Sequence, residues 1–285
     1  MPDDRPIGFF DSGVGGLTVL REVLRRLPGE GTIYLGDNAR TPYGPRSDEE
    51  VIRFSRECLD ELAAREVKAI VVACNTASAV ALGDLRSRYD VPILGVVRPG
   101  ASAAVLATRS RRVGVIATEA TVRSRAYFGA INDEDPFVEV HEHATPELVP
   151  LVEAGVIDGP IAEAAVRRAL APLLGGGPAD GGTISAGPGG ALIDTLLLGC
   201  THYPLLAPII QRVCGPSRAV IDSASATASA LASLLEINHL RATGDREPQH
   251  QQFTTGDLQT FRQTAERLFG PLFPAAAPLA LAGAA

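Results

Sequence analysis

The feature that most constrains the fold is the regular alternation of short apolar runs with segments of helical periodicity. Seven runs have the length of buried strands: residues 7–10, 32–35, 69–73, 93–96, 112–117, 137–140 and 195–198. Between the first two runs, Leu17, Leu20, Leu24 and Leu27 recur at intervals of three and four residues, which is typical of an amphipathic helix. Strands that alternate with helices predict parallel sheets flanked by helices, so the expected fold class is α/β.

A Pro-Gly turn divides the chain into two such units. At residues 97–100 a strand signal gives way to Val-Arg-Pro-Gly, and an alanine-rich helical segment follows. We expect residues 1–98 and 209–270 to form a first, discontinuous α/β domain, and residues 99–208 to form a second. The chain of 285 residues is long enough for two cores of modest size.

Two segments lack the pattern of either element. Residues 175–190 hold eight glycines, and we expect a mobile loop without a functional role. Residues 271–285 consist mainly of Ala, Leu and Pro without polar periodicity, which predicts a flexible tail.

Composition argues against several classes of ligand. The formal net charge is −7 and the 26 basic residues are scattered, so we expect no nucleic-acid partner. No apolar stretch reaches the roughly eighteen residues of a membrane span, and the start of the chain has no signal-peptide pattern, which predicts a cytoplasmic protein without membrane contact. Lys68 is the single lysine and precedes the strand at 69–73, which is a poor position for a cofactor Schiff base.

Two cysteines occur at matching positions in a pseudo-repeat. Residues 70–76 and 196–202 each run from an apolar strand to a cysteine and then to polar residues that open a helix. Cys74 and Cys200 are therefore expected at helix N-termini, where backbone N–H groups and the helix dipole favour a thiolate. The other two cysteines are interpreted as core residues of helices: Cys58 and Cys214.

A pair of thiols suits the inversion of a stereocentre by proton transfer. Such a reaction needs a base on one face of a carbon and an acid on the other, and the two groups exchange roles in the reverse direction. A cysteine thiol has an ordinary pKa of about 8.5, so both of its protonation states are accessible near neutral pH. The pattern favours proton transfer without a cofactor, with the carbanion-like state stabilised electrostatically.

The glycine-rich turn at residues 11–18 leaves two kinds of ligand open. A dinucleotide would use the turn for its phosphates and Asp37 for a ribose hydroxyl, but Thr18 stands where the third glycine is needed. We favour a turn that presents Asp11 and Ser12 to a small polar ligand. The alternative without a ligand is that Asp11 only caps the following helix.

A metal site is disfavoured by spacing. The side chains that zinc could use are an aspartate, two cysteines and a histidine: Asp11, Cys74, Cys200 and His202. No C-x-x-C or H-x-x-x-H clip is present, so the ligands would have to come from three distant strand ends. Residues 141–143, His-Glu-His, are interpreted as a solvated strand edge. We expect no metal.

Four motifs carry a resemblance to a known family: FDSGVGGLT at 10–18, PYG at 42–44, ACNTAS at 73–78 and GCTHYP at 199–204. They are similar to those of glutamate racemases, and the similarity spans about residues 6 to 230. The block at 200–204 separates this family from aspartate and hydantoin racemases. The resemblance implies a cofactor-independent isomerase that makes D-glutamate for peptidoglycan. It also implies two similar domains, related by a pseudo-twofold axis with the active site between them, and a homodimer.

The resemblance also assigns roles to residues. Cys74 would take the α-proton from D-glutamate and Cys200 from L-glutamate, with Asp11 and His202 assisting and Glu153 setting the charge of the histidine. The positions that resemble substrate-binding residues offer hydroxyls, an amide and backbone donors: Asp11, Ser12, Pro42, Tyr43, Gly44, Asn75, Thr76, Thr118, Thr121, Thr201 and His202.

Three positions depart from the family pattern, and we expect them to change only contacts behind the substrate. Asn38 and Thr41 replace the usual threonine and valine, and Thr145 replaces a common cysteine.

Three other functions are kept as alternatives. They are a racemase for aspartate or another amino acid, a binding or inhibitory protein of the kind reported to contact DNA gyrase, and a metal-dependent hydrolase.

Overall fold

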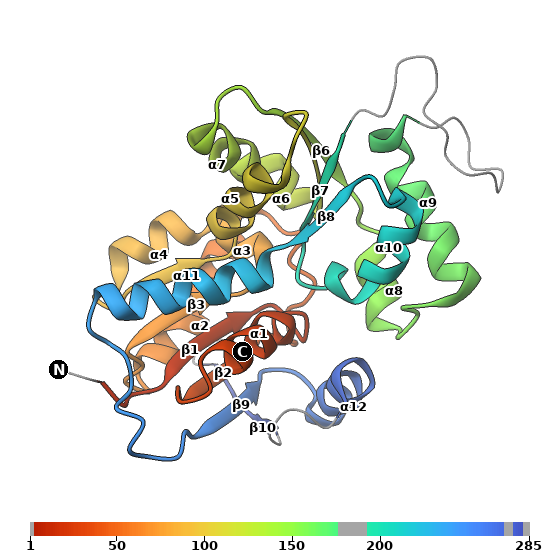
Figure 1. Ribbon diagram of the computed structural model, residues 1–285. Coiled ribbons are helices and arrows are strands. Elements are labelled where there is room, and N and C mark those ends of the chain that lie inside the picture. Colours follow the sequence, from red (N-terminus) through yellow and green to blue (C-terminus); the bar gives the residue numbers. More distant parts are fainter. Residues whose placement is uncertain (1–2, 176–192, 271–275, 282–285) are drawn as a thin grey trace.

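The computed structural model describes residues 3–175, 193–270 and 276–281, which form two parallel sheets flanked by helices (Figure 1). The first sheet has the strand order β10-β9-β2-β1-β3-β4. Its strands are Ile7–Asp11 (β1), Thr32–Gly36 (β2), Ala69–Val72 (β3), Ile93–Gly95 (β4), His250–Thr254 (β9) and Ala276–Pro278 (β10). Neighbouring strands are parallel throughout, with Ile7 opposite both Thr32 and Ala69.

The second sheet has the strand order β6-β5-β7-β8, and its strands are also parallel. They are Arg112–Ala117 (β5), Glu139–Ala144 (β6), Thr195–Gly199 (β7) and Ala219–Asp222 (β8). The expected α/β class, with two parallel-sheet domains, is confirmed. Among the residues that the structure describes, no helix has the length and apolarity that crossing a bilayer requires.

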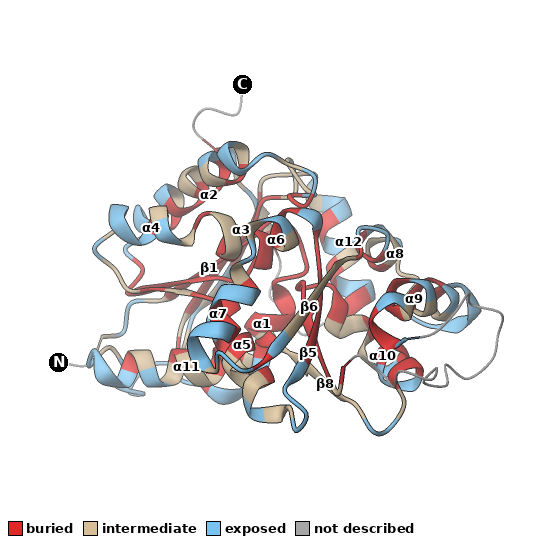
Figure 2. Cartoon of the chain, turned by 90° about the horizontal axis from the view of Figure 1, so that it is seen from above, coloured by how far each residue is buried: buried red, intermediate tan, exposed pale blue. Residues whose placement is uncertain are grey.

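Helices connect the strands and cover both faces of each sheet. They are Leu17–Arg26 (α1), Asp48–Ala63 (α2), Asn75–Val80 (α3), Leu82–Arg88 (α4), Val97–Ala107 (α5), Glu119–Ser124 (α6), Ala126–Glu134 (α7), Leu148–Glu153 (α8), Gly159–Leu174 (α9), Ala207–Cys214 (α10), Ser223–Ile237 (α11) and Leu258–Phe269 (α12), with a 3-10 turn at Tyr203–Leu206. Figure 2 shows that β1 and β5 are buried along most of their length, whereas the helices expose their outer sides.

The two faces of β1 pack into different cores because successive side chains of a strand point to opposite sides. Ile7 and Phe9 belong to the apolar cluster that includes α1 and α11, and Phe10 belongs to the cluster that includes α2. The first of these clusters continues into the second domain through Ile116 and Leu198. The two sheets therefore share one continuous apolar core on that side.

The expected boundary at residue 208 is wrong for the segment that follows it. Strand β8 pairs with β7, with Leu198 opposite Asp222, so the second sheet extends to residue 222. The chain returns to the first sheet only through α11 and β9. The run Ala-Val-Ile-Asp has only three apolar residues before an acidic one, which is why its pattern gave no strand prediction, and the structure shows it half-buried.

The expected tail also differs from the structure. Residues 276–278 form β10, which pairs with β9 at the edge of the first sheet, and Leu281 is buried against the core that includes α2. This strand can form because an edge position needs only one neighbour. Residues 271–275 and 282–285 lie outside the described residues, as does the glycine-rich segment except for Gly175.

The single lysine forms a buried ion pair at the amino end of the first sheet. The ammonium of Lys68 donates to the carboxylate of Glu30 and to the backbone oxygen of Asp3, each at 2.5 Å. The side chains of Lys68 and Glu30 are 0% and 3% exposed, so water cannot replace either partner of the pair. This position is opposite to the carboxyl ends of the strands, which confirms that Lys68 lies away from the ligand side of the sheet.

We expect Lys68→Met to lower the free energy of unfolding by about 3 kcal/mol, because the Glu30 carboxylate would remain buried without its main partner. Urea denaturation measures this difference. The control is Arg88→Met, which breaks a half-exposed pair with Asp60 and should cost less than about 1 kcal/mol. Equal effects of the two substitutions would contradict a stabilising role for the buried pair.

Candidate active site

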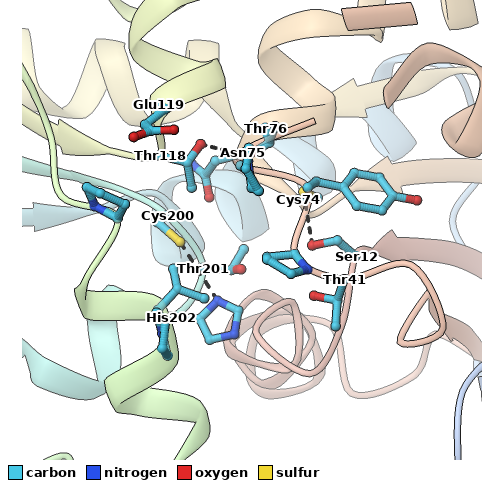
Figure 3. A pocket seen from close by; sticks show the side chains of 17 residues that line it. Ser12, Thr41, Cys74, Asn75, Thr76, Thr118, Glu119, Cys200, Thr201 and His202 are labelled. Carbon is cyan, nitrogen blue, oxygen red and sulfur yellow. Dashed lines mark hydrogen bonds between the residues drawn. The ribbon is translucent and has the colours of Figure 1, made fainter. Parts of the chain in front are cut away.

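A cavity of about 250 Å³ lies where the carboxyl ends of strands from both sheets meet (Figure 3). Its lining comes from both domains: Ser12, Thr41, Pro42, Tyr43, Gly44, Pro45, Cys74, Asn75, Thr76, Thr118, Glu119, Pro146, Val149, Pro150, Cys200, Thr201 and His202. Loops that follow parallel strands gather at this end of a sheet, which is why open α/β folds bind ligands there. The cavity brings together most of the residues singled out in the sequence.

Cys74 follows β3 and is the N-cap of α3. Its sulfur accepts a hydrogen bond from the Ala77 backbone N–H at 3.5 Å, and its thiol donates to the Ser12 hydroxyl at 3.5 Å. The side chain is 4% exposed. Burial, together with the negative charge of Asp11, raises the pKa of the Cys74 thiol to about 12, and the two hydrogen bonds offset only part of this. Cys74 is therefore a protonated thiol in the resting site.

Cys200 follows β7 and has a different environment. Its sulfur lies 3.8 Å from Nδ1 of His202, and Nε2 of the same ring lies 3.3 Å from the Glu153 carboxylate. Burial alone would lower the pKa of His202, but the Cys200 sulfur and Glu153 outweigh it and raise that pKa to about 10. At neutral pH the imidazole is therefore a cation next to the sulfur of Cys200.

The two cysteines face the same cavity from different domains. Figure 3 shows Cys74 and Cys200 on opposite sides of the pocket, with Ser12 near the first and His202 near the second. The neighbouring Cys200 is the smallest of the causes that raise the pKa of Cys74, so the two sulfurs lie near enough to interact electrostatically. A carbon held between them would meet a sulfur on each face.

The glycine-rich turn after β1 brings Asp11 beneath the cavity rather than into its wall. The Asp11 carboxylate accepts hydrogen bonds from the Gly13 backbone N–H at 2.9 Å and from the Thr201 hydroxyl at 3.4 Å. It is fully buried, and burial raises its pKa, although the charge of His202 opposes this. Asp11 thus contacts the residues next to Cys200 and does not line the space itself.

Gly15 lets this turn approach the second domain closely. A Cβ atom at position 15 would lie 2.3 Å from the Thr201 hydroxyl and 2.7 Å from Nδ1 of His202. The Thr18 hydroxyl also donates across the domain boundary to the backbone oxygen of Thr201 at 3.2 Å. The glycine pattern that resembled a dinucleotide turn therefore serves a contact between domains.

Three threonine hydroxyls join the domains on another side of the cavity. Thr76 of the first domain lies 2.9 Å from Thr118 of the second, which is 2.9 Å from Thr121. The backbone N–H of Ala120 also donates to the backbone oxygen of Gly44 at 3.1 Å. Of these threonines, Thr76 and Thr118 line the cavity, whereas Thr121 lies behind them.

Tyr43 contributes to the wall in a different way from the one the sequence suggested. Its hydroxyl donates to the Asp37 carboxylate at 2.5 Å, so it is not available to a ligand. Asp37 also pairs with Arg40 at 2.7 Å and accepts from the Thr255 hydroxyl at 2.6 Å. The acid considered for a ribose hydroxyl is thus buried in a network that anchors the loop containing Pro42 and Gly44.

Comparison with known proteins identifies the family. Residues 7–181 match the family model described as Asp/Glu/Hydantoin racemase. The chain belongs to the Asp/Glu/hydantoin racemase family. Racemases are isomerases, so the expected enzyme class is confirmed.

The similar proteins cover nearly the whole chain. A glutamate racemase from Oceanobacillus iheyensis is 46% identical over 266 residues, which are 93% of this chain and 92% of that protein. The crystal structure of a glutamate racemase isoform from Bacillus anthracis has a TM-score of 0.87 at 40% identity and covers 98% of this chain and 97% of its own. The crystal structure of the Francisella tularensis glutamate racemase in complex with D-glutamate has a TM-score of 0.85 at 33% identity, with 98% of each chain covered.

Some lining residues were not predicted from the sequence. Thr41 was expected to change only contacts behind the substrate, but it lines the cavity itself. Pro45 follows the PYG motif and Glu119 follows Thr118, so their position next to a motif residue was the sequence signal that could have identified them. The wall formed by Pro146, Val149 and Pro150 is apolar and carries no chemical signature. Within the described parts of the chain, no three His, Cys, Asp or Glu side chains converge as a metal-binding group.

We expect Gly15→Ala to abolish most of the activity of this racemase, because the added methyl group would push the Thr201 and His202 segment away from the turn. The control is Gly83→Ala, where a Cβ has no atom within 4 Å and helix α4 should be slightly stabilised. Steady-state rates and far-ultraviolet circular dichroism compare the two variants. Full activity of Gly15→Ala would show that this close approach is not required.

The raised pKa of His202 predicts a pH dependence of stability. In the folded protein His202 keeps its proton up to a pH of about 10, whereas in the unfolded chain it releases that proton near pH 6.5. The resulting contribution to the free energy of unfolding is complete below pH 6.5 and is lost as the pH rises toward 10. Between pH 6.5 and 9, His202→Gln should remove a slope of up to about 1.4 kcal/mol per pH unit. Urea denaturation across this range tests it, with the exposed His239→Asn as control. An unchanged slope would contradict the buried imidazolium.

Proposed function

We propose that this protein is a glutamate racemase that interconverts L- and D-glutamate without a cofactor, with Cys74 and Cys200 as its two proton-transfer groups. The observation that supports this most is the placement of the two thiols on opposite sides of one cavity, at strand ends of different domains (Figure 3). The similar proteins named glutamate racemase support the substrate, and one of them was solved with D-glutamate.

In the direction from L- to D-glutamate, the Cys200 thiolate takes the α-proton, and the Cys74 thiol gives its own proton to the opposite face. The electron pair of the broken C–H bond stays on the α-carbon and its carboxylate until the new C–H bond forms. The His202 cation, 3.8 Å from the Cys200 sulfur, stabilises the thiolate before the step. The raised pKa of Cys74 keeps the second proton in place.

In the reverse direction the roles exchange. The Cys74 thiolate is stabilised by the Ala77 N–H at the start of α3 and by the Ser12 hydroxyl. It takes the α-proton of D-glutamate, and Cys200 returns a proton to the other face. Asp11, buried beneath the turn, and Glu153, next to His202, set the charges around these thiols and do not exchange protons with the substrate in this account.

Among the residues that line the cavity, His202 is the one basic side chain available to a small polar ligand. The lining contains no lysine or arginine, so the two carboxylates of glutamate would be held by hydroxyls and backbone N–H groups. The proposed binding residues in the wall are Ser12, Pro42, Tyr43, Gly44, Asn75, Thr76, Thr118, Thr201 and His202. Tyr43 would act through its backbone and ring, and Thr121 through Thr118.

The proposal includes a role in the cell that rests on the family resemblance. D-glutamate produced here would enter peptidoglycan synthesis in the cytoplasm, and the enzyme would act as a homodimer.

Two rival functions can be distinguished by experiment. A panel of amino-acid substrates distinguishes a racemase for aspartate from a racemase for glutamate. A binding protein, including one that contacts DNA gyrase, would bind glutamate tightly without exchanging its α-proton.

The direct test is racemisation by purified protein that has been dialysed against a chelator and receives no cofactor. Circular dichroism at the wavelength of the amino-acid carboxylate should decay to zero from either enantiomer. Since the enantiomers are equal in free energy in water, kcat/KM must be the same in both directions. Activity on aspartate but not on glutamate, or dependence on an added metal, would overturn the proposal.

We expect Cys74→Ala and Cys200→Ala each to reduce racemisation by at least about 100-fold, because each removes one of the two proton-transfer groups. The remaining thiol should still exchange one enantiomer with solvent, L-glutamate in Cys74→Ala and D-glutamate in Cys200→Ala. Cys214→Ala is the matched control, since this buried cysteine does not line the cavity. Near-native turnover in either of the first two variants would rule out the two-thiol assignment.

A further inference from the structure

A buried tyrosine of the second domain bonds to a cavity residue of the first domain. Asn75, which directly follows Cys74, donates from its side-chain Nδ2 to the hydroxyl of Tyr127 on α7 at 2.7 Å. Tyr127 is fully buried and Asn75 is 2% exposed, so water does not compete for this bond. Burial raises the pKa of Tyr127, which keeps its hydroxyl neutral.

The ring of Tyr127 packs closely against the strand end that carries the other thiol. A Cβ atom at Gly199, the residue before Cys200, would lie 2.9 Å from Cε2 of Tyr127. The tyrosine therefore packs against the neighbour of one reactive cysteine and bonds to the neighbour of the other. Its hydroxyl has little freedom to move, and neither does the amide group that it holds.

The bond leaves one atom of Asn75 without a partner. With Nδ2 engaged by Tyr127, the side-chain Oδ1 is buried and makes no hydrogen bond within the described chain. Asn75 lines the cavity together with Thr76 and Thr118 (Figure 3). A buried carbonyl oxygen left unpaired is costly unless a ligand supplies a donor.

The chemistry of the free atom selects which group of the ligand it can meet. A carbonyl oxygen only accepts hydrogen bonds, and a carboxylate also only accepts them. Of the charged groups of an amino-acid substrate, the ammonium alone has protons to donate. We propose that Tyr127 is a positioning residue that fixes the Asn75 amide across the domain boundary, with Oδ1 directed at the substrate ammonium. The proposal rests on the proposed function, because it assumes an amino-acid substrate in this cavity.

The test removes only the hydroxyl of Tyr127. Tyr127→Phe keeps the ring that packs on Gly199 but frees the amide to rotate, so KM for both glutamate enantiomers should rise about ten-fold. The kcat should stay within about two-fold, since both thiols are unchanged. Glutarate, which has both carboxylates and no ammonium, should inhibit Tyr127→Phe with the wild-type inhibition constant. Tyr89→Phe is the control, because its hydroxyl bonds to Arg56 and Asp60 away from the cavity.

A double-mutant cycle separates positioning from general disturbance of the fold. Asn75→Leu should raise KM for glutamate at least as much as Tyr127→Phe, and the double variant should be no worse than Asn75→Leu alone. Additive effects would contradict an action of Tyr127 through Asn75. An equal weakening of glutarate, or an unchanged KM in Tyr127→Phe, would also overturn the inference while the proposed function stands. A wild-type protein that does not racemise glutamate would overturn both.

Discussion

The close approach of two backbone segments from different domains determines the geometry of the site. The turn after β1 and the segment after β7 meet at Gly15, where a side chain would overlap Thr201 and His202. This contact holds Asp11, on the first segment, against the residues that surround Cys200, on the second. The separation of the two thiols is therefore set by packed backbone and a continuous apolar core, and not by flexible side chains.

Burial has two opposite effects on this chemistry. In the proposed mechanism, a dry cavity strengthens the electrostatic interactions that would stabilise a carbanion-like state, but it also penalises the thiolates that would form it. The two halves of the site compensate by different means. Cys74 relies on the start of a helix and a serine hydroxyl, whereas Cys200 has a buried imidazolium beside it. The resting site is thus asymmetric even though the proposed substrates are mirror images.

The sequence predicted the parts of this structure that depend on local pattern. The alternation of apolar runs and helical periodicity identified strands β1 to β5 and β7, and the pseudo-repeat placed Cys74 after β3, with one residue between them, and Cys200 directly after β7. The parts that depend on pairing between distant residues were not predicted. Strand β8 and strand β10 carry weak patterns of their own and form by pairing with β7 and β9. The Asn75 bond to Tyr127 links a motif residue with one that had no signature in the sequence, and the pairing of Asp37 with Tyr43 was not foreseen although each had been considered for a ligand role.

In the proposed mechanism, each face of the substrate α-carbon meets its own proton donor and acceptor. The most direct measurement is solvent-isotope incorporation in D₂O, sampled at low conversion and started separately from L- and D-glutamate. If two thiols act on opposite faces, the product enantiomer should carry deuterium at the α-carbon while the recovered substrate retains protium, in both directions. Deuterium appearing in recovered substrate as fast as in product would point to a single exchanging base and would contradict the account.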